Sequence, residues 1–300
     1  GLQGLAHTEL AFQKSLAYAR DRLQMRSLSG PKNPGGPADP IIVHPDVRRM
    51  LLTQKAFAEG GRALIYFAST QGDILTKSDN PEARELANHV LNFLTPIIKA
   101  FLTETGFESA NLGLQCFGGH GYVNEWGLEQ NVRDARIGTL YEGTTGIQAL
   151  DLLGRKVLGT RGKALAPVTG FILDFCKRSK DVKEIRPYLR KLVRLTKQWK
   201  ALTRKIGFAA MRNRDAVGAA SVDYIMFSGY VLLGVAWAAS ARAAYKRLEQ
   251  GTTEEAFYRA KIQTAEFYFA KILPRTTALL ETMSTGPDSL MKMDEQQFMF

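Results

Sequence analysis

One carboxylate in this chain stands in a setting that suits proton transfer. Glu142 is followed at once by Gly143, then by two threonines, Thr144 and Thr145, and then by a helical pattern. A glycine-rich backbone lets a flat ligand approach closely, because no Cβ atom stands in the way. A carboxylate beside such a surface is a candidate proton acceptor. Without this context, the same glutamate is more often a first-turn residue that complements a helix dipole.

A glycine motif precedes this carboxylate. The run from Gln115 to Tyr122 reads Gln-Cys-Phe-Gly-Gly-His-Gly-Tyr, and the run 133–137 reads Arg-Asp-Ala-Arg-Ile. The glycines follow an expected helix and not a strand, so they form neither the dinucleotide-binding fingerprint of a β-α unit nor a P-loop. No pair of the four histidines has the spacing of metal ligands, so we expect no metal site.

Helices must position these residues. The segment 5–24 contains no proline and no glycine, and the Gly/Pro-rich run 29–37 after it must be a loop. Further helices are expected from Pro45, from Asn80-Pro81 toward residue 102, and over about 107–117. Gly60-Gly61 interrupts the apolar stripe of the first of these helices, where we expect close helix packing. No alternation with period two persists, so the sequence predicts an all-α fold built from two helical bundles.

The C-terminal half reads as a separate bundle. Glycines at 159 and 162 mark a boundary, so we expect one domain over residues 1–158 and a second over 159–300. The segment 224–241 has no charged residue, which reaches the lower limit for a membrane span. Because small polar residues interrupt it and charges flank it closely, we expect a buried core helix and no transmembrane span.

The net charge of +11 is concentrated in one helix. Between Lys183 and Arg214 there are eleven Lys or Arg residues and one acid, Glu184. The apolar side chains of this segment fall on the opposite face of a helical wheel. We expect a solvated outer face on a packed helix. The alternative is a surface for anionic lipid, CoA phosphates or nucleic acid, although we regard nucleic acid as the less favoured partner.

Together these motifs resemble the C-terminal catalytic region of the acyl-CoA dehydrogenases, flavoproteins that desaturate acyl-CoA thioesters. The resemblance covers residues 2–158 and is densest from Gln115 to Val157. Residues after 158 are similar to the additional helical domain of a larger, bacterial-type branch. The resemblance implies that Glu142 is the general base, that its backbone N–H polarises the thioester carbonyl, and that Gly143 lies against the substrate.

The resemblance also implies an FAD site. Arg22 occupies the place of an arginine near the end of the first long helix that touches the FAD of a neighbouring subunit, and Gln24 follows it. Two further sets of contacts are implied. They comprise Gln115, Cys116, Phe117, Gly118 and Gly119 in the glycine motif and Thr144, Thr145 and Gly146 after the base. The threonines are also well placed to cap the following helix.

The expected activity is FAD-dependent α,β-dehydrogenation of acyl-CoA to trans-2-enoyl-CoA. By resemblance, an electron-transfer flavoprotein accepts the electrons and the protein is a homodimer or homotetramer. Two well-separated cysteines predict a reducing, cytoplasmic location. Family members also have an N-terminal helical domain and a middle β-domain, which this chain lacks, so we expect it to bind FAD weakly by itself. An acyl-CoA oxidase and a non-catalytic relative that binds nucleic acid or membrane through the basic helix are the alternatives.

Overall fold

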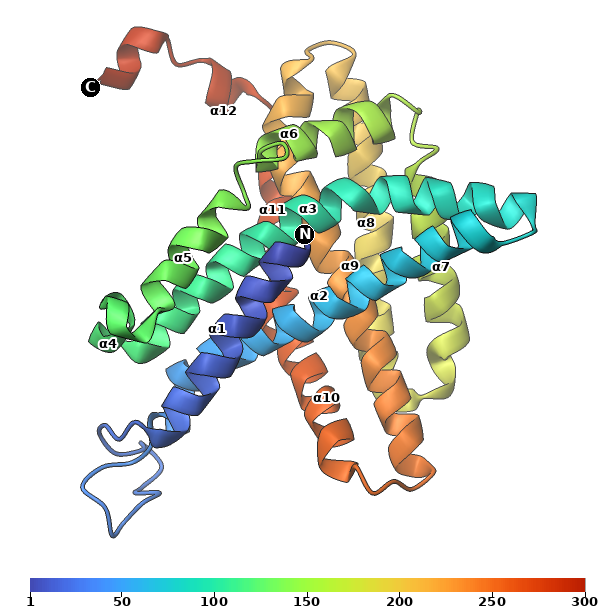
Figure 1. Ribbon diagram of the computed structural model, residues 1–300. Coiled ribbons are helices and arrows are strands. Elements are labelled where there is room, and N and C mark those ends of the chain that lie inside the picture. The colour runs from blue at the N-terminus through green and yellow to red at the C-terminus, as the bar shows by residue number, and fades with distance from the viewer. Residues whose placement is uncertain (300) are drawn as a thin grey trace. The chain divides into compact units, whose positions relative to one another are not determined.

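The computed structural model describes residues 1–299, and their secondary structure is helical (Figure 1). Within these residues the only β-type pairing is an isolated bridge between Leu23 and Pro40. The predicted all-α fold class is therefore confirmed. The α-helices are α1 (Leu2–Asp21), α2 (Pro45–Lys77), α3 (Pro81–Phe117), α4 (Gly119–Tyr122), α5 (Leu128–Ile137), α6 (Thr145–Leu150), α7 (Leu165–Arg178), α8 (Arg186–Ala210), α9 (Asp215–Glu249), α10 (Glu255–Phe267), α11 (Arg275–Thr282) and α12 (Asp288–Met291). Two π-helical segments (Asp151–Leu158 and Tyr268–Ile272) and five 3₁₀ segments (Ile41–Val43, Asn124–Trp126, Ser179–Asp181, Lys183–Ile185 and Glu295–Met299) complete the list.

The helices group into two compact units. The first contains Gly1–Arg62 and Leu102–Glu142, and the second contains Ala63–Phe101 and everything from Gly143 onward. The long helices α2 and α3 run through both units. This grouping joins residues 63–101 and 143–158 to the C-terminal helices, so a domain boundary at residue 158 stays a prediction.

The first unit is built on a close crossing of α1 and α3. A Cβ atom on Gly4 would lie 2.1 Å from the carbonyl oxygen of Leu102, and one on Gly106 would lie 2.6 Å from that of Gly4. Because backbone stands on both sides of the crossing, only glycine fits at these positions. The α1 helix also contacts α5. A cluster of buried side chains, among them Ala19, Met50 and Leu128, fills the space beyond the crossing.

The close packing expected at Gly60-Gly61 of α2 is confirmed, whereas the expected end of α3 near residue 102 was wrong. The α2 helix runs through Gly60-Gly61, and a Cβ atom on Gly61 would lie 3.1 Å from a methyl group of Leu102. The α3 helix does not end near residue 102 and includes Pro96. Its predicted start is confirmed, since the Asn80 side chain accepts hydrogen bonds from the N–H groups of Glu82 and Ala83.

The second unit is organised around α9, which contacts α6, α8, α10 and α11. This helix is long and apolar enough to cross a membrane by length and composition, but 78% of its most apolar window is buried inside the protein. The α9 helix is therefore a core helix of the second unit, as the sequence predicts. The Trp199 side chain of α8 packs edge-on against the rings of Tyr224 and Phe227 of α9, and all three are fully buried.

Candidate active site

The turn that carries Glu142 has an uncommon backbone conformation. Glu142 has φ of 57° and Gly143 has φ of 85°. The left-handed region is sparsely populated for residues with a Cβ atom, and such residues gather at functional sites. At Gly143 a Cβ atom would also stand 3.0 Å from the side-chain nitrogen of Gln148. The Glu142 side chain is exposed. The turn therefore presents a carboxylate at the surface, and the next residue, Gly143, has no side chain.

Helix α6 begins directly after this turn. The Thr144 side chain accepts a hydrogen bond from the Ile147 N–H at 3.3 Å and so caps the helix, as the sequence predicts. Thr145 and Gly146 form the first residues of α6. None of these three residues lines the cleft that holds the other predicted dinucleotide contacts. Their proposed contact with a cofactor stays a prediction.

A residue that sequence reasoning missed contacts the same turn. Lys99, half-buried on α3, donates a hydrogen bond from Nζ to the carbonyl oxygen of Gly143 at 2.6 Å. The lysine lies 44 positions before the glycine. A single lysine on a long helix carries no motif, so nothing in the sequence marks it.

The glycine motif and the end of α1 meet at one cleft in the first unit. Its volume is about 560 Å³. The cleft contains seven of the ten predicted dinucleotide contacts, namely Arg22, Gln24, Gln115, Cys116, Phe117, Gly118 and Gly119. The structure therefore brings together residues that are more than 90 positions apart in the sequence. Cys116 and Phe117 are buried and form the floor, whereas the other five are exposed.

The glycines of this cleft fit a ligand that approaches from outside. Gly118 has φ of 59°, and a Cβ atom on either Gly118 or Gly119 would meet no protein atom within 4 Å. Crowding by the protein therefore does not explain Gly119, whereas a Cβ there would stand in the open cleft. With the Arg22 guanidinium at its rim, the cleft offers backbone access and a positive charge, which suit part of an anionic dinucleotide.

Aromatic side chains support this cleft. The Tyr18 ring stacks on Phe117 at a centroid distance of 4.0 Å, and the His120 ring stacks on Trp126 at 5.1 Å. Tyr18 Oη and His120 Nδ1 lie 2.9 Å apart. His120, which belongs to the glycine motif, lies on the cleft wall. Tyr18 and Trp126 were not predicted, because isolated aromatic residues in helices are usually core residues.

The loop after α1 is held in place by Asp39, another residue that the sequence did not reveal. The fully buried Asp39 carboxylate accepts hydrogen bonds from the N–H groups of Ser27, Lys32 and Asn33 and from the Arg26 guanidinium. Burial opposes ionisation, but these donors outweigh it and lower the pKa of Asp39 to about 2. The Asp39 backbone also pairs with Gln24 and Met25. The loop thereby fixes the segment that carries Arg22 and Gln24.

Cys116 is an unreactive part of the cleft floor. Burial raises the pKa of its thiol to about 11, with small opposing effects from Ser15 and Gln54. A thiol with this pKa is protonated near neutral pH and is a poor nucleophile. Cys116 therefore contributes shape, and not covalent chemistry, to this cleft.

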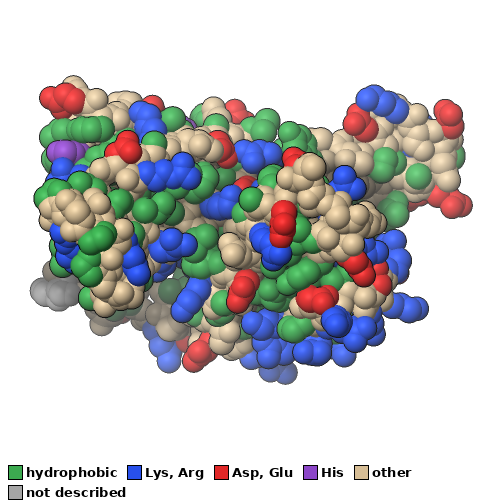
Figure 2. Space-filling model, turned by 90° about the horizontal axis from the view of Figure 1, so that it is seen from below, with side chains coloured by type: hydrophobic (Ala, Val, Ile, Leu, Met, Phe, Trp, Pro, Cys, Tyr) green, Lys and Arg blue, Asp and Glu red, His purple; other side chains and the backbone are tan. Residues whose placement is uncertain are grey.

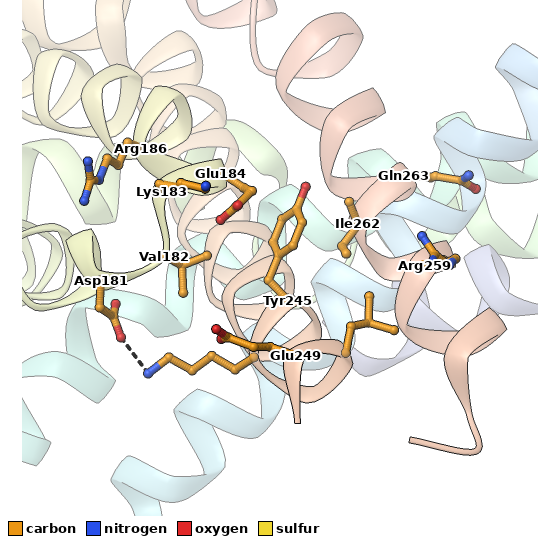
Figure 3. Close-up of a pocket in the computed structure, with 12 residues that line it drawn as sticks. Asp181, Val182, Lys183, Glu184, Arg186, Tyr245, Glu249, Arg259, Ile262 and Gln263 are labelled. Carbon is orange, nitrogen blue, oxygen red and sulfur yellow. Dashed lines mark ion pairs between the residues drawn. The ribbon is translucent and has the colours of Figure 1, made fainter. Parts of the chain in front are cut away.

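Another cleft lies in the second unit and contains none of the predicted site residues. It has a volume of about 1030 Å³ and lies between the segment 181–186, the end of α9, and α10. Figure 3 shows Tyr245 between Glu184 and Ile262 in this cleft. An ion pair of 2.6 Å joins Asp181 to Lys246 there, and Arg242 also binds Asp181 at 2.7 Å. Both acidic and basic side chains therefore line this cleft, and Asp181 and Lys246 neutralise one another.

The basic helix has the two faces that the sequence predicts. Its apolar side chains are buried, including Leu192 and Trp199, which are fully covered. Its basic side chains are exposed, namely Arg186, Arg190, Lys191, Arg194, Lys197, Lys200, Arg204 and Lys205. Lys and Arg side chains gather along one edge of the face seen in Figure 2. Within residues 1–299, no ion pair involves a basic residue of α8.

No cluster of three or more His, Cys, Asp or Glu side chains with the arrangement of a metal site occurs among the residues that the structure describes.

Two family models match most of this chain. The model for the acyl-CoA dehydrogenase C-terminal domain matches residues 1–158, and a model described as acetyl-CoA dehydrogenase C-terminal like matches residues 168–294. Among curated proteins, the chain is 38% identical over 292 residues to 3-methylmercaptopropionyl-CoA dehydrogenase of Ruegeria pomeroyi, covering 97% of this chain and 49% of that protein. It is 34% identical over 310 residues to the broad-specificity linear acyl-CoA dehydrogenase FadE5 of Mycobacterium tuberculosis, covering 99% and 50%. The chain thus spans about half the length of the curated relatives it matches.

Solved structures share the fold. An acyl-CoA dehydrogenase complexed with FAD from Bacillus anthracis matches with a TM-score of 0.69 at 17% identity, over 93% of this chain and 46% of that one. ACDH-11 of Caenorhabditis elegans in complex with C11-CoA matches with a TM-score of 0.67 at 18% identity, over 89% and 41%.

Proposed function

The chain belongs to the acyl-CoA dehydrogenase family, and from this premise we propose that it supplies the catalytic base and part of the FAD site of an enzyme that dehydrogenates acyl-CoA thioesters at the α and β carbons. The observation that carries the proposal is the turn at Glu142. Its left-handed backbone, the glycine after it and the capped helix beyond it present one exposed carboxylate in a fixed place. A strained conformation at a carboxylate favours a role in chemistry over a role in packing.

In this proposal, Glu142 removes the proton from the α carbon of the acyl chain. Such a proton is weakly acidic, so the thioester carbonyl must be polarised while the proton leaves. The Glu142 backbone N–H is the proposed donor to that carbonyl oxygen. Gly143, which has no side chain, leaves room for the thioester against the backbone. The base and the polarising donor would then belong to the same residue.

The proposed FAD site is the cleft at the end of α1. Arg22 at the rim suits the phosphates by charge, and Gly118 and Gly119 leave backbone exposed to a ligand. When bound, FAD supplies the acceptor for the hydride that leaves the β carbon, a role that no side chain can perform. The family resemblance also proposes Thr144, Thr145 and Gly146 as cofactor contacts.

We propose acyl-CoA as the substrate, an electron-transfer flavoprotein as the electron acceptor and a homodimer or homotetramer as the assembly. Each rests on the family resemblance. The cytoplasmic location is likewise a proposal, supported by two widely separated, buried free cysteines.

The test uses the full-length protein that contains this chain. It should purify with bound FAD, and saturated acyl-CoA thioesters added without oxygen should bleach the flavin absorption and yield the trans-2-enoyl thioester. A series of acyl lengths then identifies the substrate class. A full-length protein that holds no flavin, or whose flavin stays oxidised with every saturated acyl-CoA, would overturn the proposal.

A further inference from the structure

We propose that Lys99 is a positioning residue for this reaction, and that its ammonium group holds the turn of the general base in the conformation that presents Glu142. The inference rests on the proposed function of Glu142. It adds a residue from a distant helix to the machinery. Lys99 acts on the turn through the backbone and needs no contact with substrate.

The lysine reaches the turn from a rigid base. Its neighbours Ile97, Ala100 and Phe101 on α3 are fully buried. The Phe101 ring packs edge-on against Tyr230 of α9 at a centroid distance of 5.0 Å, and a Cβ atom on Gly229 would lie 2.2 Å from that ring. The backbone that carries Lys99 is therefore fixed by the core of the second unit. The hydrogen bond from Lys99 Nζ therefore ties the Gly143 carbonyl to a fixed part of the protein.

The turn needs an external contact. Gly143 has wide conformational freedom because it lacks a Cβ atom, and the two consecutive positive φ values at residues 142 and 143 are one state among several. The Thr144 cap fixes the side of the turn that leads into α6. Lys99 fixes the Gly143 carbonyl, and with it the plane of the peptide that joins Gly143 to Thr144. A hydrogen bond from a charged donor is stronger than a neutral one.

The Thr144 cap and the Lys99 hydrogen bond restrain different parts of the turn. The cap holds residues after Gly143, and the lysine holds the carbonyl of the residue directly after the base. When the lysine contact is lost, the capped helix remains, but the peptide that joins Gly143 to Thr144 loses its charged donor and gains freedom to rotate. The base would then spend less time in the productive geometry, which lowers the rate of proton removal more than the affinity for substrate.

The chain offers a matched control. Lys191 on α8 also donates to a backbone carbonyl, that of Phe269, at 3.1 Å, and it lies in the same unit. Lys191→Met removes a comparable lysine–backbone contact at a place that holds no predicted site residue. Lys99→Met removes the ammonium at similar side-chain length, and Lys99→Arg restores a charged donor.

The experiment measures flavin reduction by acyl-CoA in single turnover, in the full-length protein with bound FAD. Lys99→Met should lower the limiting rate constant by about tenfold, while the dissociation constant for acyl-CoA changes less than about threefold. Lys99→Arg should recover most of the rate, and Lys191→Met should leave it unchanged. Equal rates for Lys99→Met and the unaltered protein would overturn the inference, as would a loss that Lys99→Arg does not relieve at all.

A second measurement does not depend on activity. Backbone amide exchange in the peptide 139–150 should quicken in Lys99→Met relative to Lys191→Met, while peptides from the core of α9 exchange alike in both. Uniform protection of 139–150 in the two variants would overturn the inference even if Lys99→Met cannot hold FAD. An unaltered protein whose flavin is never reduced would instead refute the proposed function, so the two failures are distinguishable.

Discussion

Tyr18 Oη lies 2.9 Å from Nδ1 of His120 and joins the end of α1 to the glycine motif. The carbonyl of Tyr18 also accepts the Arg22 N–H at 2.8 Å, so one residue contacts both sets of predicted dinucleotide contacts in the first unit. Tyr18 thus connects the two segments that carry these predicted contacts, and its ring stacks on Phe117 at the cleft wall.

Tyr18→Ala should weaken FAD binding by about tenfold, since a stacked aromatic pair is worth about 0.5–1.5 kcal/mol beyond its buried area. Tyr18→Phe keeps the stack on Phe117 and loses only the hydrogen bond, so its effect should be smaller than about threefold. Titration of the apo full-length protein with FAD measures both. Equal affinities for the Ala variant and the unaltered protein would show that the cleft does not hold the cofactor.

The buried carboxylate of Asp39 predicts a loop that depends on pH. Its pKa in the folded protein is about 2, below the ordinary value of about 3.9. Ionised Asp39 therefore stabilises the loop fully above that ordinary value, and the contribution is lost as the pH falls through the folded pKa. The loop should stay ordered at pH 5 and loosen only in more acidic solution.

Asp39→Asn should loosen the same loop at neutral pH. The amide lacks the negative charge of the carboxylate that accepts hydrogen bonds from three backbone N–H groups and from Arg26. Trypsin should then cleave after Arg26 or Lys32 faster than in the unaltered protein, by about tenfold or more if opening limits cleavage. Asp46→Asn, at an exposed carboxylate on α2, is the control. If Asp39→Asn changes neither the cleavage rate after Arg26 nor that after Lys32, Asp39 does not hold this loop.

The crossing of α1 and α3 predicts an asymmetry between glycines. Gly4→Ala forces a Cβ atom against the backbone of Leu102, so we expect a loss of about 1–3 kcal/mol in the free energy of unfolding. Gly72→Ala places its Cβ in open space within α2 and should add about 0.5–1 kcal/mol, because alanine favours a helix. Thermal midpoints of the full-length variants test the pair, and a Gly4→Ala protein as stable as Gly72→Ala would contradict the crossing.

The basic face of α8 should prove to be solvated. Replacing Arg190, Arg194 and Lys197 by Gln should leave the thermal midpoint and turnover nearly unchanged, since exposed charges are worth only about 0.2–1 kcal/mol even in pairs. Binding to DNA and to anionic vesicles, measured at physiological salt, should be undetectable before and after the change. Salt-sensitive binding that the triple change abolishes would instead assign the face to an anionic polymer or lipid surface.

Much of the fold follows from local pattern, and its exceptions have a tertiary cause. Asn80-Pro81 marks a helix start that the structure confirms, because cap and first-turn proline act within a few residues. The sequence suggested a gap between helices near Gly106, yet this glycine lies inside the continuous helix α3. At Gly106 the facing residue is Gly4, about a hundred positions earlier, and no local signal announces such a contact.

The candidate site divides in the same way. Glu142, Gly118 and Gly119 belong to contiguous motifs, so their types and spacing reveal them. Lys99 and Asp39 act through single contacts to backbone groups, and any lysine or aspartate in their segments would look the same in sequence. Residues that position a motif from elsewhere in the chain become visible only once the fold brings them beside it.

If Glu142 is the base, Glu142→Gln in the full-length protein should abolish proton removal. The amide keeps the size of the side chain and cannot accept the α proton, so FAD should remain bound while flavin reduction by acyl-CoA slows by at least about 100-fold. Glu142→Asp, which retains a shorter carboxylate, should be impaired less. Rapid bleaching of the flavin by saturated acyl-CoA in the Glu142→Gln protein would contradict the account and place the base elsewhere.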